Sequence, residues 1–190
     1  MKDERGRQGM IEIRWHGRGG QGAVTSVELL ALAAIEEGKY AQGFPSFGPE
    51  RRGAPVAAFN RVDSERIRIR SGIYHPDVVV VLDESLIGLV NVTEGLKPNG
   101  KLIVNTSKKA ADVMKILNYS GAIATVDATG IAWKELGVPI TNTTMLGALV
   151  KVTGVVGLDA LNGPVEHRFG RIASKNMAAL KRAFDEVKIN

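Results

Sequence analysis

The 190-residue chain contains no cysteine. This absence excludes disulfide bonds, thiolate zinc sites and any iron–sulfur cluster ligated by cysteines of this chain. No apolar run approaches the roughly 20 residues that a membrane-spanning helix requires, and no basic and apolar leader opens the sequence. The three histidines are too scattered to indicate a metal site. We therefore expect a cytoplasmic protein without membrane contact and without a metal ion of its own.

Aromatic residues are also scarce, at 5% of the chain. Proteins that bind single-stranded nucleic acid stack bases on aromatic side chains, and no strand of this sequence alternates aromatic with basic residues. We therefore expect no nucleic-acid partner. The formal net charge of +5 is compatible instead with a phosphorylated cofactor or an acidic protein partner.

Glycine is in excess: 22 of the 190 residues are glycine, which is about 12%, whereas about 7% is usual. Residues 1–9 are charged, lack apolar periodicity and are expected to form a flexible N-terminal extension. Residues 10–190 have the length of a single domain. From residue 77 onward strands and helices alternate, beginning with the aliphatic run Val78–Leu82. This alternation predicts a three-layer α/β/α domain with a mainly parallel sheet.

The remaining pattern predicts the elements around that sheet. A strand at Ile11–Trp15 leads into a helix at Ala23–Glu36, and residues 39–55 are so rich in glycine and proline that they predict a loop. We expect an antiparallel hairpin of Val56–Val62 with Arg66–Arg70, and a helix from Ser85 to about Leu96. Ligands of such sheets bind beyond the carboxyl ends of the parallel strands. The residues expected there are His16, Asp83, Asn105 and Asp127.

The first candidate site is the glycine turn, Gly17–Gly22, between the first strand and helix. Gly17, Gly19 and Gly22 satisfy the pattern G-x-G-x-x-G, in which backbone N–H groups and a helix N-terminus approach a phosphate. A dinucleotide site would also need an acidic residue about 20 positions later, and Tyr40–Pro45 contains none. Three interpretations stay open: a phosphate site, a protein interface, or close packing of helix on sheet. The turn contributes the candidate ligand residues Gly17, Arg18, Gly19, Gly20, Gln21 and Gly22.

The second candidate site is the arginine loop, Phe44–Pro55. Its prolines and glycines fix a shape, and Arg51 and Arg52 give it a positive charge suited to phosphate or carboxylate. The alternative is a solvated pair with an internal salt bridge to Glu50. No nucleophile elbow, P-loop or spaced catalytic pair is present, so we assign no catalytic residue. His16 is expected to be a hydrogen-bonded residue at a strand edge.

Several blocks of the sequence resemble a known family. They lie in order along residues 10–155 and are Ile11–Ala23, Phe44–Pro55, Pro76–Asp83, Val126–Thr129 and Thr141–Ala148. Together they resemble the gamma subunit of 2-oxoacid:ferredoxin oxidoreductases. The similarity is greatest to the pyruvate synthase and 2-ketoisovalerate branch, in which some organisms share one gamma subunit between two enzymes.

The resemblance implies a subunit of a complex that converts pyruvate or a related 2-oxoacid, CoA and oxidised ferredoxin to acyl-CoA, CO₂ and reduced ferredoxin, reversibly. Thiamine diphosphate with magnesium is expected between the alpha and beta subunits, and [4Fe–4S] clusters in a delta subunit. The resemblance makes Arg51 and Arg52, and secondarily the glycine turn, candidate contacts for CoA phosphates.

Two alternatives remain. The chain is a purely structural assembly subunit without ligand contacts, or an independent NADP-binding protein in which Arg51 or Arg52 holds the 2′-phosphate. In isolation a subunit of this kind is also expected to form homodimers.

Overall fold

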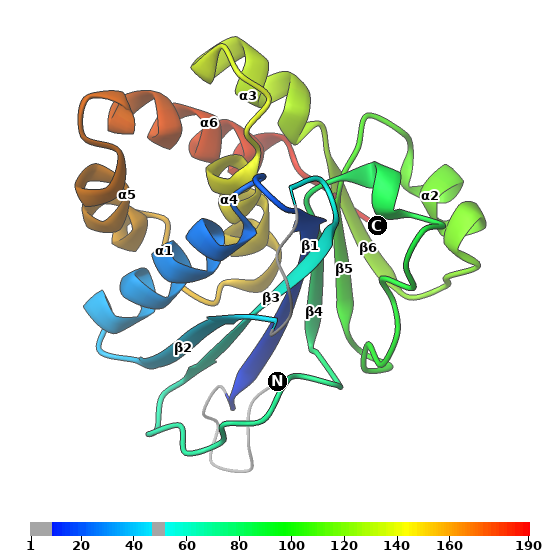
Figure 1. Cartoon of the computed structure of the whole chain (residues 1–190), viewed down its shortest axis with the longest axis horizontal. Coiled ribbons are helices and arrows are strands. Elements are labelled where there is room, and N and C mark those ends of the chain that lie inside the picture. Colours follow the sequence, from blue (N-terminus) through cyan, green and yellow to red (C-terminus); the bar gives the residue numbers. More distant parts are fainter. Residues whose placement is uncertain (1–8, 47–51) are drawn as a thin grey trace.

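The computed structural model describes residues 9–46 and 52–190 of the chain. Its centre is a seven-stranded sheet with the order β2-β3-β1-β4-β5-β6-β7 (Figure 1). The strands are β1 (Ile11–Arg18), β2 (Tyr40–Pro45), β3 (Pro55–Asp63), β4 (Val78–Val81), β5 (Lys101–Asn105), β6 (Ala122–Val126) and β7 (Lys188–Ile189). Strands β1, β4, β5 and β6 are parallel, whereas β3 is antiparallel to both β1 and β2, and β7 to β6. The expected α/β class, with a parallel centre and antiparallel additions, is confirmed.

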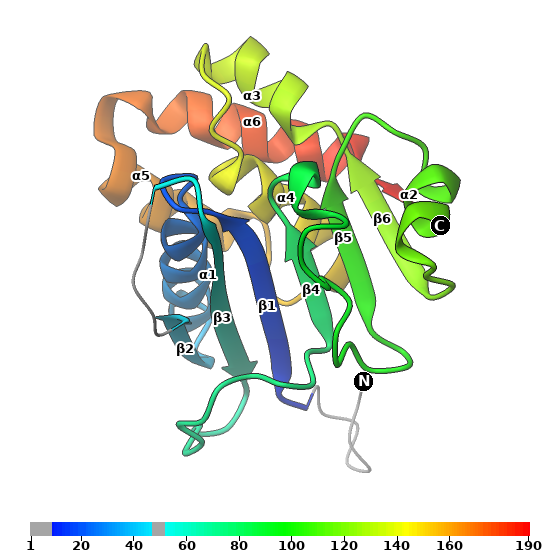
Figure 2. The same ribbon diagram turned by 45° about the vertical axis from the view of Figure 1, so that its right-hand side comes forward.

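Among the described residues, five α-helices cover one face of the sheet and a sixth lies on the other (Figures 1 and 2). The first group is α1 (Ala23–Glu36), α3 (Ala128–Leu136), α4 (Asn142–Thr153), α5 (Asn162–Phe169) and α6 (Ala173–Glu186), and the sixth is α2 (Ala110–Leu117). Because side chains alternate along a strand, β4 sends Val78 and Val80 into the larger core and Val79 and Val81 into the smaller. No helix in the described residues is long and apolar enough to cross a membrane.

Helix α4 lies at the centre of the larger core, with residues 142–150 all buried. Its closest neighbour is α6, and Gly147 makes that approach possible. A Cβ atom at Gly147 would overlap the carbonyl oxygen of Leu180. Lys151 of α4 places its ammonium group 4.7 Å from the centre of the Phe184 ring, a cation–π contact at the rim of the same interface.

On the other face of the sheet, Arg14 of β1 binds the irregular segment that follows β4. The guanidinium of Arg14 donates hydrogen bonds to the carbonyl oxygens of Val92 (3.1 Å) and Glu94 (2.5 Å). Burial lowers the pKa of Arg14, and the charge of Glu94 acts in the opposite direction. Arg14 therefore attaches the segment after β4 to the sheet through that segment's backbone.

Arg61 of β3 plays the same part for the connection from β3 to β4. Its side chain is 1% exposed and donates to the carbonyl oxygens of Ser71 (2.8 Å) and Gly72 (3.2 Å). Its charge is balanced by Glu12 at 2.9 Å, and its guanidinium carbon lies 5.5 Å from the centre of the Phe44 ring. Such a buried arginine is stable because every side of it meets an acceptor or a ring.

The predicted hairpin is wrong, because Arg66–Arg70 does not form a strand. Both edges of β3 are already paired, one with β1 and the other with β2, so no edge is free for a second hairpin strand. The strand that pairs with β3 in place of Arg66–Arg70 is β2. The sequence did not predict β2, because it lies inside residues 39–55, which were expected to form a loop.

Strand β2 escaped prediction because of Gly43 and Pro45, which usually interrupt strands. Gly43 is required here, since a Cβ atom would lie 2.7 Å from Cγ1 of Val27 on α1. Pro45 is tolerated because β2 is an edge strand of the sheet.

The predicted helix from Ser85 to Leu96 is also wrong. Only the short 3₁₀ helix η1 (Glu84–Leu86) forms there. Gly88 and Gly95 adopt positive φ angles of 88° and 66°, which end any helix. At Gly95, a Cβ atom would overlap the carbonyl oxygen of Tyr74, so the turn at this glycine also allows the close approach of the preceding connection.

Candidate functional site

The structure joins the glycine turn to the arginine loop. Strand β1 continues through Arg18, beyond its predicted end, and Gly19 then pairs with the end of the arginine loop. The Gly19 N–H donates to the carbonyl oxygen of Ala54 at 2.9 Å, and the Gly53 N–H donates to that of Gly19 at 3.0 Å. The Arg18 guanidinium adds a bond to the Gly53 carbonyl at 2.9 Å. Two sites that lie about 30 residues apart in the sequence are therefore one surface.

Of the two loop arginines, Arg52 lies on this surface and is exposed. It forms a β-bridge with Gly19, and its Cγ atom would lie 4.0 Å from a Cβ atom at Gly20. Arg52 makes no ion pair with any residue of 9–46 or 52–190. Arg51, the other predicted contact, lies outside the described residues.

The glycines of the turn serve its shape. Gly20 and Gly22 have positive φ angles of 94° and 81°, and a Cβ atom at Gly22 would lie 2.5 Å from the amide nitrogen of Asn142. Several backbone donors are already used within the chain: the N–H of Arg18 binds the Gln21 side chain at 2.8 Å, and that of Gln21 binds the Arg18 carbonyl at 3.0 Å. With the Gly19 donor also used, the turn offers fewer N–H groups to a phosphate than its sequence indicates.

A cleft of about 430 Å³ opens next to this surface, at the carboxyl ends of the parallel strands. Its walls include Gln21, Asp83, Asn105, Thr106, Asp127 and Thr141. Three of the four residues predicted to follow the strands are therefore brought together, whereas His16 does not line the cleft. Thr106 and Thr141 were not predicted to lie at the site. Thr106 could have been identified by the same criterion as its neighbour Asn105, because it directly follows the end of a parallel strand.

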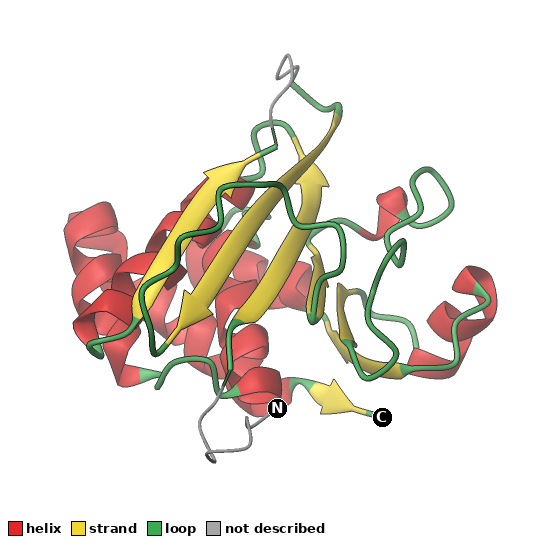
Figure 3. Ribbon diagram, turned by 90° about the horizontal axis from the view of Figure 1, so that it is seen from below, coloured by secondary structure: helices red, strands yellow, loops and turns green. Residues whose placement is uncertain are grey.

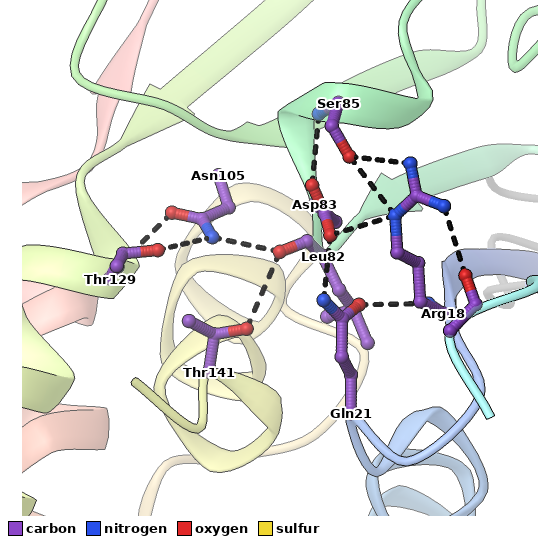
Figure 4. A network of polar contacts seen from close by, with 9 residues as sticks. Arg18, Gln21, Leu82, Asp83, Ser85, Asn105, Thr129 and Thr141 are labelled. Atoms are coloured by element: carbon purple, nitrogen blue, oxygen red, sulfur yellow. Dashed lines mark hydrogen bonds and ion pairs between the residues drawn. The ribbon is translucent and has the colours of Figure 1, made fainter. Parts of the chain in front are cut away.

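Asp83 connects the cleft to the glycine turn (Figure 4). It accepts hydrogen bonds from the Gln21 amide at 2.6 Å and the Ser85 N–H at 2.9 Å, and it lies 3.3 Å from the Arg18 guanidinium. Burial opposes ionisation of Asp83, but these bonds and the Arg18 charge outweigh burial and lower its pKa. Asp83 is therefore a carboxylate, fixed in place by neighbours on both sides.

Asn105 fixes the opposite wall of the cleft. Its amide nitrogen donates to the Leu82 carbonyl at 2.8 Å and to the Thr129 hydroxyl at 2.9 Å, while its amide oxygen accepts from the Thr129 N–H at 3.1 Å. The Thr141 hydroxyl approaches the same Leu82 carbonyl at 3.4 Å. Figure 4 shows Asn105 bonded to both Leu82 and Thr129, with Thr141 approaching the same Leu82 carbonyl, so hydrogen bonds between separate segments preorganise this wall.

The lining of the cleft is acidic and contains no basic residue among those that the structure describes. Asp83, Glu84 and Asp127 contribute carboxylates to the lining. The Thr106 hydroxyl and Lys108 both donate to Glu84 and lower its pKa. Among the residues that the structure describes, no group of histidines and carboxylates is arranged to hold a metal ion.

His16 lies on β1 between Ala57 of β3 and Val81 of β4. Its Nε2 atom is buried and has no hydrogen-bond partner in the described part of the chain. Burial, reinforced by the positive charge of Arg14, lowers the pKa of His16 to about 4. The expectation of a hydrogen-bonded histidine is therefore not met at this nitrogen, and the imidazole is neutral at physiological pH.

The topology disfavours the alternative of an NADP-binding protein. A dinucleotide fold continues from its first helix into a second parallel strand, whose end presents the ribose-binding group. Here α1 leads into β2, which is antiparallel to β3 and lies at the edge of the described sheet. Within residues 9–46 and 52–190, the strand that directly follows α1 does not pair with β1 as a second parallel strand that could present a ribose-binding group.

Comparison with known proteins gives a consistent assignment. A model of the family described as pyruvate ferredoxin/flavodoxin oxidoreductase matches residues 12–186. The pyruvate/ketoisovalerate oxidoreductases common subunit gamma of Thermococcus kodakarensis is 54% identical over 182 residues, which cover 95% of this chain and 98% of that protein. The crystal structure of pyruvate oxidoreductase subunit PORC from Thermotoga maritima matches with a TM-score of 0.86 at 45% identity, over 96% of this chain and 99% of that one.

The same fold recurs inside a longer chain. A structure of 2-oxoglutarate:ferredoxin oxidoreductase from Magnetococcus marinus, with 2-oxoglutarate, coenzyme A and succinyl-CoA bound, matches with a TM-score of 0.72. The match covers 94% of this chain but 30% of that one, and its 20% identity supports a common fold only. The resemblance expected from the sequence blocks is thus confirmed by two closer relatives and a family model. The chain belongs to the pyruvate ferredoxin/flavodoxin oxidoreductase family, as a gamma subunit of the 2-oxoacid:ferredoxin oxidoreductases.

Proposed function

We propose that this gamma subunit positions coenzyme A in a complex that oxidatively decarboxylates pyruvate or a related 2-oxoacid. The observation that carries the proposal is the joined surface of glycine turn and arginine loop beside the cleft. Bonds between Gly19, Gly53 and Ala54 place Arg52 over the glycine turn, at the sheet edge where ligands of α/β proteins bind. A structure of 2-oxoglutarate:ferredoxin oxidoreductase, which shares this fold, contains bound coenzyme A.

Charge divides the proposed site into two parts. The phosphates of CoA are repelled by Asp83, Glu84 and Asp127, so they do not suit the cleft interior. They suit the surface formed by the glycine turn and the arginine loop, where Arg52 is exposed and makes no ion pair with a described residue. A guanidinium group can bind phosphate in bidentate fashion. The neutral amide and hydroxyl groups of the pantetheine arm suit the cleft, whose walls offer hydroxyls, amides and carboxylates.

The chemistry itself is assigned to other subunits. Any iron–sulfur cluster must be ligated elsewhere, because this chain has no cysteine. We propose thiamine diphosphate with magnesium at the alpha and beta subunits and [4Fe–4S] clusters in the delta subunit, with ferredoxin as the electron acceptor. This chain contributes binding and orientation, and no proton-transfer residue is assigned to it.

A purely structural role is the second candidate. Trp133, Val138 and Ile140 are 54%, 43% and 45% exposed. Val138 and Ile140 are chain neighbours of Pro139 and Thr141, which line the cleft. An apolar surface of this kind is typical of a contact with another protein. In this alternative the cleft is covered by a partner subunit and binds no ligand.

Substitution of Arg52 separates the two candidates. In the assembled complex, Arg52→Ala should raise the KM for CoA about tenfold, the value of one charge-assisted phosphate contact, while the subunit composition stays unchanged. Arg171→Ala is the matched control, because Arg171 is also exposed and has no ion pair with a described residue. Loss of the subunit from the complex with an unchanged KM for CoA would support the structural role instead.

A further inference from the structure

The segment Arg66–Arg70 has the sequence pattern of a strand but pairs with no strand among the residues that the structure describes. Ile67 and Ile69 alternate with Arg66, Arg68 and Arg70, the pattern of a half-buried strand. None of the backbone–backbone hydrogen bonds outside helices and strands involves these five residues, as far as the chain is described. All three arginines are exposed, and Ile69 is 46% exposed.

The fold holds this segment in place without pairing it. At one end, the Glu65 N–H binds the Asp63 carboxylate at 3.2 Å; at the other, buried Arg61 binds the carbonyl oxygens of Ser71 and Gly72. Figures 1 and 3 show the connection from β3 to β4 crossing the end of the sheet at which the parallel strands begin. The segment therefore lies on the opposite end of the molecule from the cleft.

The charge of the segment indicates its partner. Arg66, Arg68 and Arg70 form no ion pair within the described ranges, so three guanidinium groups are available to carboxylates. A second copy of this chain is a poor partner: it carries a net charge of +5, and antiparallel pairing of two such segments would place arginine opposite arginine. An acidic strand matches both the unpaired backbone and the charge.

We propose that Arg66–Arg70 pairs as an added strand with an acidic extended segment or sheet edge of another subunit of the oxidoreductase. Backbone hydrogen bonds supply affinity in this mode of recognition, and alternate side chains supply specificity. The arginines face the carboxylates of the partner, while Ile69 and the 74% exposed Tyr74 provide apolar contact area. The proposal rests on membership of a multi-subunit family and is independent of CoA binding.

Hydrogen exchange of the complete complex and of the isolated chain tests the backbone pairing. Amides of residues 66–70 should exchange at least about tenfold more slowly in the complex, because strand pairing protects them. Equal exchange in the two states overturns the proposal. Protection that already develops in the isolated chain as its concentration rises also overturns it, because the occupant is then a second copy.

Charge reversal tests the partner's chemistry. The variant Arg66→Glu, Arg68→Glu, Arg70→Glu should weaken retention of this chain by the co-purified subunits at least about tenfold. The matched control is Arg171→Glu, Lys175→Glu, Lys181→Glu, an equal change of charge at three exposed positions, which should leave retention within about twofold. An equal loss of retention in both variants would show that only the net charge of the chain matters, and would overturn the proposal. The Arg52 variant, in contrast, changes the KM for CoA and not retention, so the two proposals fail separately.

Discussion

The partly buried imidazole of His16 makes the stability of this chain depend on pH in a defined window. Its pKa is lowered from 6.5 to about 4, first by burial and then by Arg14. The unfolded chain therefore binds a proton between these values that the folded chain does not. The contribution of neutral His16 to the free energy of unfolding is fully present above about pH 6.5 and is lost as the pH falls toward about 4. Below about pH 4, His16 causes no further change.

The magnitude follows from the two pKa values. Each tenfold change in proton affinity corresponds to about 1.4 kcal/mol. The shift of the His16 pKa from 6.5 to about 4 therefore lowers the free energy of unfolding by about 3 kcal/mol at pH 4 relative to neutral pH. Asp83 and Glu84 also lose stabilising interactions in acid, because their pKa values are lowered. A comparison with His16→Gln cancels that contribution, since glutamine is polar, similar in size and does not titrate.

The assay is urea unfolding of both proteins at several pH values, followed by fluorescence of the fully buried Trp15. Between about pH 7 and pH 4, wild type should lose about 3 kcal/mol more than His16→Gln. Parallel stability curves for the two proteins would refute the reasoning, and so would a wild type that gains stability in acid relative to the variant. Direct titration of His16 by NMR would then show an ordinary pKa.

Two further substitutions probe packing and the cleft. Gly147→Ala should lower the unfolding free energy by about 1–3 kcal/mol, because its methyl group overlaps the Leu180 carbonyl. In the control Gly163→Ala, the new methyl group meets only the end of the flexible Glu36 side chain, so the unfolding free energy should change by no more than about 1 kcal/mol. Equal urea midpoints for the two variants would contradict the packing argument. Gln21→Leu should raise the pKa of Asp83 toward its usual value, because the carboxylate loses one of its donors; an unmoved carboxyl resonance in an NMR titration would contradict the described network.

The parallel centre of the sheet and the cleft beyond it were predictable from the sequence. Strands such as Val78–Val81, buried on both faces, have a composition that only a covered parallel sheet explains. The position of Asp83, Asn105 and Asp127 then follows from topology, since the carboxyl ends of parallel strands meet at one edge. The same argument failed for His16, because β1 continues to Arg18 and so places His16 inside the sheet.

The antiparallel edge was not predictable, because long-range contacts override local signals there. Gly43 and Pro45 oppose a strand, yet β2 forms because glycine alone fits against Val27. Conversely, Arg66–Arg70 has the pattern of a strand and no partner among the described residues. The joining of glycine turn to arginine loop depends on backbone bonds of Gly19, which no pattern of side chains encodes.

The way in which Arg14 and Arg61 hold the irregular segments has a consequence for the divergence of this family. Both guanidinium groups bind carbonyl oxygens of the segments, at Val92 and Glu94 and at Ser71 and Gly72, and every amino acid offers a carbonyl. Substitution of exposed side chains in these segments therefore leaves these hydrogen bonds in place, whereas buried Val92 and the closely packed Gly95 are constrained by packing. The exposed face of these segments can therefore change in sequence while the sheet beneath keeps its structure.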